Sequence, residues 1–430
     1  MLSCFYIKIS EEILVKEIEL EKKLVELLGK QKLFQWDNYA LDKDRNLNKI
    51  DEEIYNLLKN NYTQNYFQGR KKELFERLYF KLIIENDPEI SKLKNKLDNN
   101  DNYNKQLDKV EADYQVKIAK RKREDIIKLM KLRNSKAINL GFESYPNLCF
   151  YCEEVDKSSV IKIVKKYLED NIDKANNLIK KYGLNWENWF IKLRSLGNID
   201  KTEPSYYFDC LLNKLGLKIN KDNINFKFKE DGISGMTFNI SISDEIRILA
   251  KPITSPMTCR VFFHECGHAI NYITSQGKGL YNIYTPLHDE AIAIIFENIG
   301  IKICMNKREE KIAEDVKFLE AIRCSISFLF EMELWETPNK AEELFKKYQS
   351  LLKMKTKKKE MWTLDSFRYI DSIYIQNYVL GEIYANKIIN RLKNEHGDNY
   401  EQWGEKIYQF FLKDAMKNKF KEKYNRFISN

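Results

Sequence analysis

Apolar residues recur at intervals of three and four along the first two hundred residues, as they do on one face of an amphipathic helix. The first such run comprises Ile13, Leu14, Ile18, Leu24, Val25 and Leu28. Gly29 follows directly, and because glycine is common just after a helix, the pattern predicts a helix that ends there. Similar spacing continues further along the chain, and it predicts a helical N-terminal lobe over residues 1–222.

The pattern changes near residue 223, where apolar and polar residues begin to alternate. Alternation marks three segments, Asn223–Lys229, Met236–Ser243 and Ile246–Leu249. A period of two predicts strands with one buried face. We therefore expect a small antiparallel sheet over residues 223–250, with Gly232 and Gly235 in the link between its first two strands.

Two helix starts follow the predicted sheet. Ser255 precedes Pro256, and Thr285 precedes Pro286. A hydroxyl side chain at the N-cap and a proline in the first turn are typical of helix N-termini. These signals predict helices over about 256–275 and about 286–300, with more helices to the end of the chain. Residues 223–430 would form a second lobe, the two lobes one folded unit, and the fold class would be mainly α.

Composition excludes several classes of protein. The chain has 430 residues, of which 43% are hydrophobic, with only 15 Gly and 7 Pro. This content excludes a disordered chain and argues against an all-β fold with many tight turns. The formal charge is +9, and the basic run Lys120–Arg123 is interpreted as a solvated helix face rather than a nucleic-acid site. Eight irregularly spaced cysteines favour reduced thiols over a disulfide framework.

Targeting signals are not evident in the sequence. The first residues do not show the basic segment followed by an apolar segment that is typical of a secretory signal peptide. No apolar stretch approaches the roughly 18 residues that span a bilayer. We therefore expect a soluble, cytoplasmic protein without nucleic-acid or membrane partners. As to assembly, we expect a monomer or a weak homo-oligomer.

Histidine is the rarest of the chemically informative residues, with 4 in the chain, three of them in one short window. His264, Glu265 and His268 form an HExxH motif inside the helix predicted to begin at Pro256. Four residues are about one helical turn, so both imidazoles project from one face and can hold one zinc ion. Glu265 lies where its carboxylate can take a proton from a metal-activated water. The alternative is a helix whose two histidines pack against or cap another group.

A catalytic zinc site needs a third protein ligand. Glu290 stands 22 residues after His268, in the first turn of the second predicted helix, and the apolar run Ala291–Phe296 follows it. A buried helix that carries Glu290 and Glu297 requires partners for both carboxylates. Seven residues are about two helical turns, so the two acids share a face. We expect Glu290 to be the third metal ligand and Glu297 to accept a hydrogen bond from the imidazole of a ligand histidine. The alternative for each is an acid that faces solvent.

These motifs resemble those of the oligoendopeptidase F and thimet oligopeptidase family of zinc peptidases, most closely the oligoendopeptidase F side. Phe263–Ala269 is similar to the family's zinc helix, and Glu290 with Glu297 to its third-ligand helix. Ser234–Met236 stands where the family has a substrate-binding edge strand, and Tyr374–Gly381 is similar to its Tyr-rich segment. The resemblance runs from about residue 125 to 400. It implies a two-lobed helical body around a deep channel that admits short peptides.

The resemblance also implies roles for individual residues. Tyr378 matches the position whose phenol stabilises the oxyanion, with a core aromatic as the alternative. The edge strand would bind substrate backbone through Gly235, Met236, Thr237 and Phe238.

Four further residues complete the expected site. Asp289 is expected to support a ligand. His288 is expected to contact substrate, or to sit in the loop before its helix. Tyr374 is expected among the substrate-binding residues, with packing in the core as the alternative. Arg368 stands where relatives carry a histidine, and its guanidinium would donate a hydrogen bond in place of that imidazole.

The sequence therefore predicts a zinc-dependent endopeptidase that acts on short peptides, with one Zn2+ per chain and Glu265 as general base. A zinc carboxypeptidase of the angiotensin-converting-enzyme-like type is an alternative, because it shares the HExxH motif and the downstream Glu. A catalytically silent peptide-binding relative that keeps its zinc is a second alternative, motivated by Arg368. A basic helical nucleic-acid binder is a third, motivated by the net charge.

Overall fold

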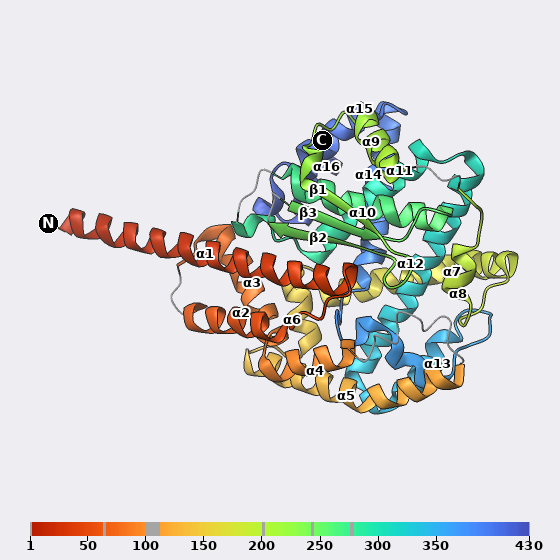
Figure 1. Cartoon of the computed structure of the whole chain (residues 1–430), viewed down its shortest axis with the longest axis horizontal. Helices are drawn as coiled ribbons and strands as arrows, with labels where there is room; N and C mark the ends of the chain where they lie inside the picture. The colour runs from red at the N-terminus through yellow and green to blue at the C-terminus, as the bar shows by residue number, and fades with distance from the viewer. Residues whose placement is uncertain are drawn as a thin grey trace.

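The computed structural model describes residues 2–62, 66–99, 112–199, 203–241, 245–275 and 279–429, with the side chains of 2–14, 99, 112 and 113 not described. Helices dominate these ranges (Figure 1). In chain order the helices are α1 (Leu2–Ala40), α2 (Asn48–Asn61), α3 (Gly69–Glu85), α4 (Pro88–Asn99), α5 (Ala112–Asn139), α6 (Tyr145–Cys152), α7 (Lys157–Tyr182), α8 (Trp189–Arg194), α9 (Pro204–Lys214), α10 (Pro256–Thr274), α11 (Pro286–Cys304), α12 (Lys307–Glu336), α13 (Ala341–Gln349), α14 (Gln376–His396), α15 (Tyr400–Ile407) and α16 (Phe420–Ser429). The predicted mainly helical fold class is confirmed.

The sheet has three strands, β1 (Ile224–Phe228), β2 (Gly235–Ser241) and β3 (Glu245–Ala250), in the order β1-β3-β2. Strands β2 and β3 pair antiparallel, but β1 and β3 pair parallel. The sheet is therefore mixed, and the expectation of a wholly antiparallel sheet was wrong. The reason is topological: β3 lies between the first two strands, so the chain crosses over it between β1 and β2 instead of turning back in a hairpin.

Helix α1 does not end at Gly29 but continues to Ala40. A Cβ atom at position 29 would collide with the backbone carbonyl oxygen of Ile240 in β2. Glycine is thus required here for a close approach between helix and strand, which outweighs its usual preference for helix ends. Further along α1, the Trp36 ring packs edge-on against Phe238, with ring centroids 5.5 Å apart. Figure 1 shows α1 running beside β2.

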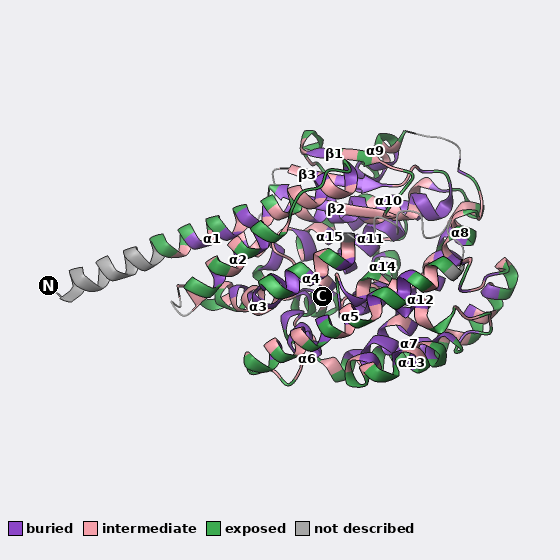
Figure 2. Cartoon of the chain, turned by 60° about the horizontal axis from the view of Figure 1, so that its bottom comes forward, coloured by how far each residue is buried: buried purple, intermediate pink, exposed green. Residues whose placement is uncertain are grey.

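The two predicted catalytic helices form where the capping signals placed them. In α10, Ser255 is the N-cap and Pro256 lies in the first turn, and the Ser255 side chain accepts a hydrogen bond from the Thr258 amide. In α11, the Thr285 side chain accepts from the His288 amide. Both helices are largely buried, as Figure 2 shows. They pack against each other more extensively than any other pair of elements in the described chain.

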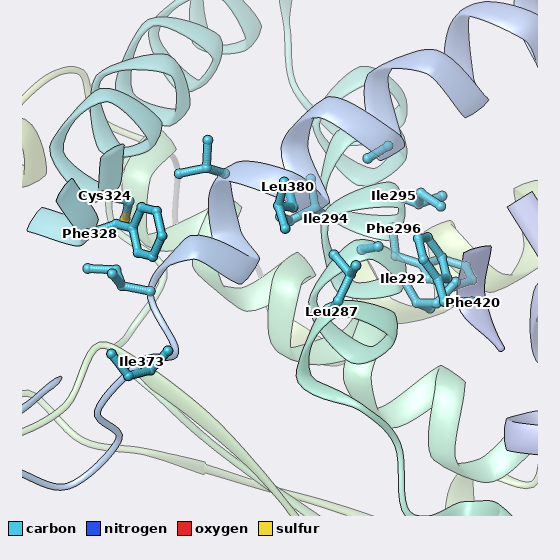
Figure 3. Packing of buried hydrophobic residues seen from close by; sticks show 14 of the residues in the cluster. Leu287, Ile292, Ile294, Ile295, Phe296, Cys324, Phe328, Ile373, Leu380 and Phe420 are labelled. Atoms are coloured by element: carbon cyan, nitrogen blue, oxygen red, sulfur yellow. The ribbon is translucent and has the colours of Figure 1, made fainter. Parts of the chain in front are cut away.

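Helix α11 runs through the hydrophobic core with apolar side chains on most of its faces. Figure 3 shows Ile294 beside Leu380 of α14 on one flank, and Phe296 on another. A helix that is apolar all round is buried on all sides, so the few acidic residues that α11 carries must find partners inside the protein.

Elements from both predicted lobes pack against one another. Helix α7 packs along α12, and α5 packs against the short helical segment Lys359–Leu364. The division at residue 222 and the two-lobed enclosure of a channel stay predictions. Among the helices of the described ranges, none combines the length and apolar character that a bilayer crossing needs.

Candidate active site

Helix α10 presents its two histidines as the four-residue spacing predicts. The Nε2 atoms of His264 and His268 lie 3.2 Å apart. The rings are nearly perpendicular, with centroids 4.8 Å apart. Both imidazoles therefore direct the same nitrogen toward one point beside the helix.

Helix α11 brings Glu290 to that point. Its Oε2 lies 3.2 Å from His264 Nε2, and its Oε1 lies 4.0 Å from His268 Nε2. One ligand atom from each of the three residues can be chosen so that all lie within 4.8 Å of one another. No other group of three His, Cys, Asp or Glu in the described ranges meets this criterion.

These three side chains fit a zinc ion. Ligand atoms about 2.0–2.1 Å from one zinc ion in tetrahedral geometry lie about 3.4 Å from one another. The two Nε2 atoms lie 3.2 Å apart, and His264 Nε2 lies 3.2 Å from Glu290 Oε2, which is close to this value. Glu290 Oε2 is buried without a hydrogen-bond partner in the structure. Such an acceptor is costly to bury unless a cation or a donor meets it. Two imidazoles and one carboxylate are the donor set of many catalytic zinc sites.

A second carboxylate, that of Glu297, contacts the ring nitrogen of His264 that faces away from the predicted metal. Glu297 Oε2 lies 3.0 Å from His264 Nδ1, and its Oε1 accepts a hydrogen bond of 2.8 Å from Arg260. Burial alone would raise the pKa of Glu297, but Arg260 and His264 outweigh it and hold this pKa at about 2. Glu297 is therefore ionised at neutral pH, and it fixes which His264 nitrogen is left for a metal.

Asp289 stands in the same relation to His268. Its Oδ1 lies 3.1 Å from His268 Nδ1. Asn271 donates to Oδ1 at 3.0 Å and Tyr272 donates to Oδ2 at 2.5 Å. Burial would raise the pKa of Asp289, but His268 and these donors lower it. The sequence analysis gave no site role to Asn271 or Tyr272, although their positions three and four residues after His268 place them on its face of α10.

Glu265 is held by strand β2. Its Oε2 accepts a hydrogen bond of 2.8 Å from Thr237 Oγ1, which also lies 3.0 Å from the Glu265 backbone oxygen. Burial raises the pKa of Glu265, and the neighbouring histidines and Thr237 only partly oppose this. A Cβ at Gly235 would stand 2.7 Å from Glu265 Oε1, so glycine makes room for the carboxylate. Thr237, predicted to bind substrate, thus positions Glu265.

Two tyrosines of the predicted Tyr-rich segment flank Glu290. Tyr374 donates a hydrogen bond of 2.5 Å to Glu290 Oε1. Tyr378 lies with its ring 6.2 Å from that of His264, and it lines one cavity together with His264 and Glu265. Burial raises the pKa of both phenols well above the usual range. Both hydroxyl groups therefore stay protonated and can donate hydrogen bonds. Tyr374 was expected to bind substrate, but its hydroxyl contacts the predicted metal ligand Glu290.

Phe238 and Met236 do not face the site. Side chains alternate along a strand, so the neighbours of Thr237 point to the opposite side of β2. Phe238 is fully buried there against Trp36, and Met236 packs on the same small cluster. The Phe238 side chain is therefore covered by α1. The expected binding of substrate backbone along the edge strand β2 does not involve this side chain, and it stays a prediction.

His288 also lies away from the predicted ligands. It is fully buried, its Nδ1 is 3.0 Å from Met416 Sδ, and its ring packs on Phe420 and Tyr284. Two residues along a helix rotate a side chain by roughly 200°, so His288 and Glu290 occupy opposite sides of α11. The expectation that His288 contacts substrate was wrong for this reason.

The Arg368 side chain is paired with two acids and a serine. Its guanidinium makes ion pairs with Glu331 at 3.1 Å and Asp365 at 3.3 Å, and it hydrogen-bonds to Ser327. It is 3% exposed. These contacts hold the guanidinium in place. Arg368 lines a cavity next to the one that His264 and Glu265 border, and its expected hydrogen bond to substrate stays a prediction. A neighbour that the sequence analysis missed, Phe367, lines the metal-site cavity instead.

The metal-site cavity lies next to a larger one. The first, of 230 Å³, is bordered by His264, Glu265 and Tyr378. The second, of 520 Å³, has walls of aromatic side chains such as Trp186 and Phe330. The residues shared by the two cavities are Phe190, Arg323 and Phe367. These three side chains therefore separate the cavity at the predicted zinc ligands from a larger neighbouring cavity.

Comparison with known proteins gives matches in structure only. No protein-family model matches the sequence, and no curated protein matches it. Solved structures match over nearly the whole chain. The M32 carboxypeptidase from Deinococcus radiodurans R1 is similar with a TM-score of 0.68 at 10% identity, covering 96% of this chain and 94% of that one.

Two other solved structures extend this comparison. Metallocarboxypeptidase 1 of Trypanosoma cruzi has a TM-score of 0.67 at 10% identity, covering 98% of this chain and 96% of that one. A putative oligoendopeptidase F from Bacillus anthracis str. Ames has a TM-score of 0.56 at 14% identity, covering 92% and 81%. The chain therefore has the fold shared by these structures, among which stands the oligoendopeptidase F that its motifs resemble.

Proposed function

We propose that the protein is a zinc-dependent peptidase that cleaves within short peptides. The observation that carries this proposal is the convergence of His264, His268 and Glu290 next to the buried carboxylate of Glu265. Three ligands with two supporting carboxylates leave a coordination position open, as catalytic zinc sites do. The names of the structurally similar proteins support peptide hydrolysis as the reaction class.

The predicted ligands and Glu265 have different roles in the proposed hydrolysis. When bound to His264, His268 and Glu290, a zinc ion supplies Lewis acidity that polarises a carbonyl and makes a nearby water more acidic. Glu265 takes the proton of the attacking water and delivers it to the leaving amine. Its raised pKa brings it closer to the pH at which it works.

Tyr378 acts at the oxyanion. The raised pKa of its phenol keeps the proton in place, so the hydroxyl donates to negative charge that develops on the substrate carbonyl oxygen. Its position in the same cavity as His264 and Glu265 supports this role. Tyr374, by contrast, is engaged with Glu290 and orients that ligand.

A carboxypeptidase is the second candidate. It is favoured by coverage, because this chain spans 94% and 96% of the two carboxypeptidase structures but 81% of the oligoendopeptidase F structure. A peptide blocked at both ends separates the two activities, since a carboxypeptidase needs a free C-terminus. A peptide-binding protein without activity is the third candidate, and it requires bound metal with no cleavage of any peptide.

We also propose a cytoplasmic location. The seven cysteines whose side chains the structure describes are free, and Cys149 and Cys152 are buried. Reduced thiols are the usual state in the cytoplasm. The peptides acted on there would be short and unfolded.

The test of the catalytic assignment is Glu265→Gln. The variant should keep its metal, because Glu265 is not a ligand, while peptide turnover should fall by about 10²-fold or more, the contribution of a positioned general base. Turnover is measured on a peptide library by mass spectrometry, with and without a chelator, and metal content by elemental analysis. Turnover like that of the unmodified protein would overturn the assignment of Glu265.

A further inference from the structure

The cavity of 520 Å³ next to the metal-site cavity is lined by many aromatic side chains. Those that line it without reaching the metal-site cavity are Trp186, Trp189, Phe330, Phe345 and Tyr348. Protein interiors are close-packed and leave few voids larger than a water molecule. An aromatic space of this size is therefore typical of a ligand site rather than of a packing defect. The proposed hydrolytic chemistry does not use it.

The wall between this cavity and the metal-site cavity consists of partly exposed side chains. They are Phe190 of α8, Arg323 of α12 and Phe367 of the short helical segment Ser366–Arg368. Partly exposed side chains change rotamer readily, so this wall can open to a group that comes from the metal site. By contrast, a cavity of 290 Å³ has no described lining residue in common with either of the two.

Phe367 links the wall to the reacting centre. The ring of Phe367 lies 6.1 Å from that of Tyr378, and the ring of Tyr378 lies 6.2 Å from that of His264. An extended peptide spans about 3.3–3.6 Å per residue. A substrate residue within about three positions of the bond at the predicted metal can therefore lie beside Phe367 and direct its side chain at the wall.

Charged side chains also line the cavity, but they are paired within the protein. The pairs are Arg368 with Asp365 at 3.3 Å, Arg323 with Glu320 at 3.1 Å, and Glu187 with Lys355 at 2.9 Å. Lys357, which also lines the cavity, has an interaction partner as well. These pairs leave the aromatic surfaces as the groups that an occupant would contact.

The two indole N–H groups of the cavity are engaged too. Trp186 Nε1 donates to the Gln349 backbone oxygen at 3.1 Å, and Trp189 Nε1 donates to Glu320 at 2.5 Å. Both indoles are held in place by these bonds, and their rings stack with centroids 5.5 Å apart. The aromatic walls are therefore fixed before an occupant enters, which lowers the entropic cost of binding.

Two guanidinium groups favour an aromatic occupant over an aliphatic one. Arg368 lies over the ring of Phe330 at 5.0 Å, and Arg323 lies over that of Phe190 at 5.2 Å. Both arginines line the cavity. A guanidinium attracts the face of an aromatic ring, and rings attract one another edge to face. An aliphatic side chain gains neither interaction.

On the basis of the proposed peptidase function, we propose that this cavity binds an aromatic side chain of the substrate peptide. The side chain belongs to a residue within about three positions of the cleaved bond, and it enters between Phe190, Arg323 and Phe367. The cavity volume of 520 Å³ lies within the range of small-ligand pockets, about 300–1,000 Å³. It is large enough for the ring of Phe, Tyr or Trp.

The experiment moves one Phe through a short peptide of Ala and Ser, both ends of which are free. Mass spectrometry identifies the cleaved bond. At one fixed position relative to that bond, Phe should exceed Ala by about 10-fold or more in kcat/KM. Cyclohexylalanine, an aliphatic ring of similar size, should fall below Phe there by about 3-fold, the effect of a cation–π contact. Equal rates for Phe and Ala at every position, or for Phe and cyclohexylalanine, overturn the aromatic site.

Phe345 on α13 gives variants of the cavity wall. It lines the large cavity but not the metal-site cavity, and it is partly exposed, so a change there is compatible with folding. Phe345→Trp narrows the cavity and should lower the preference for Phe over Ala by about 5-fold or more. Phe345→Ala widens it and should raise the rate on a Trp peptide relative to the Phe peptide.

The matched controls are Tyr206→Trp and Tyr206→Ala on α9. Tyr206 is 60% exposed and lines neither of the two cavities. Both ratios should be the same in the control variants as in the unmodified protein. Ratios that stay unchanged in both Phe345 variants as well overturn the aromatic site.

A binding measurement separates this proposal from the proposed function. Metal-loaded Glu265→Gln protein, with and without Phe345→Trp, is titrated calorimetrically with the Phe peptides and the Ala peptide. One Phe peptide should bind about 10-fold more tightly than the Ala peptide, and Phe345→Trp should reduce this difference. Equal binding of all peptides overturns the aromatic site. Absence of cleavage by the unmodified protein together with Phe345-dependent binding overturns the peptidase function alone.

Discussion

Each imidazole of the predicted metal site has a carboxylate on the nitrogen that faces away from the metal. Glu297 takes this place for His264, at 3.0 Å, and Asp289 for His268, at 3.1 Å. Each of these acids is fixed in turn by donors of α10, since Arg260 holds Glu297 and Tyr272 holds Asp289. The orientation of both rings is therefore set before any ion binds, which lowers the entropic cost of binding one.

The residue-scale prediction for this support is Glu297→Gln. The amide keeps the shape of the side chain but loses the charge that Arg260 and His264 share. We expect the affinity for zinc to fall by about 10- to 100-fold, as for other residues that orient a metal-bound imidazole. Competition with a chelating dye measures the affinity. Glu342→Gln on α13, where the carboxylate pairs with Lys359, is the control. Equal affinities of the Glu297→Gln and control variants would contradict the role of Glu297.

Glu153 offers a residue-scale test by pH. Burial raises its pKa in the folded protein to about 7, against a usual value of 4.5. Between these pH values the folded state binds a proton that the unfolded state does not. The free energy of unfolding should therefore fall as the pH rises through this window, by on the order of 3 kcal/mol from this group.

The matching variant, Glu153→Gln, has no group to titrate at this position. The free energy of unfolding of the unmodified protein minus that of the variant should fall as the pH rises from about 4.5 to about 7. Urea unfolding at closely spaced pH values measures both. A difference that stays constant over this range would show that Glu153 does not hold the extra proton.

At the scale of elements, the site depends on how closely α10 and α11 approach. A Cβ at Gly267 would stand 2.7 Å from Ala293 Cα and 2.9 Å from the Ala293 backbone oxygen. Backbone atoms cannot yield as a flexible side chain does, so glycine at this position lets the two helices come together. His268 and Glu290 lie within one turn of this crossing, and their separation follows from it.

Gly267→Ala tests this dependence. On helix propensity alone the change would stabilise the protein by about 1 kcal/mol. We expect the opposite sign, a loss of about 1–3 kcal/mol from forced separation of the helices, together with weaker zinc binding. Thermal unfolding and chelator competition measure the two effects. A raised melting temperature would show that the contact between Gly267 and Ala293 does not require glycine.

At the scale of the whole molecule, the cavities around the site limit what can enter. Their volumes are 230, 290 and 520 Å³, which suits side chains and short stretches of extended backbone but not a folded domain. Helices from both halves of the chain line them, among them α3 and α6 at the cavity of 290 Å³ and α12 at the other two.

The corresponding prediction concerns substrate conformation. A peptide that the protein cleaves should resist cleavage when the same sequence is part of a stably folded protein, with a rate at least about 10²-fold lower, because the segment must unfold to enter. Mass spectrometry of both digests gives the two rates, and prior heat denaturation of the folded substrate should restore cleavage. Equal rates on the folded and free forms would contradict entry by unfolded segments only.

The sequence by itself determined the parts of this protein that depend on local spacing. One helical turn separates His264 from His268, so their shared direction follows from the α-helix alone. The caps at Ser255 and Thr285 likewise fix where both helices begin. The apolar surroundings of Glu290 indicated that the acid required a buried partner, and the structure provides the neighbours.

Only the tertiary structure decided the features that depend on contacts between segments distant in the sequence. Alternation along β2 indicates that Thr237 and Phe238 face opposite ways, but not which of them meets α10. The parallel pairing of β1, the passage of α1 past Gly29 and the ion pairs of Arg368 each depend on segments distant in sequence. Hydrophobic period and capping are local signals, whereas the partner of a buried charge is chosen by long-range packing, which no local pattern encodes.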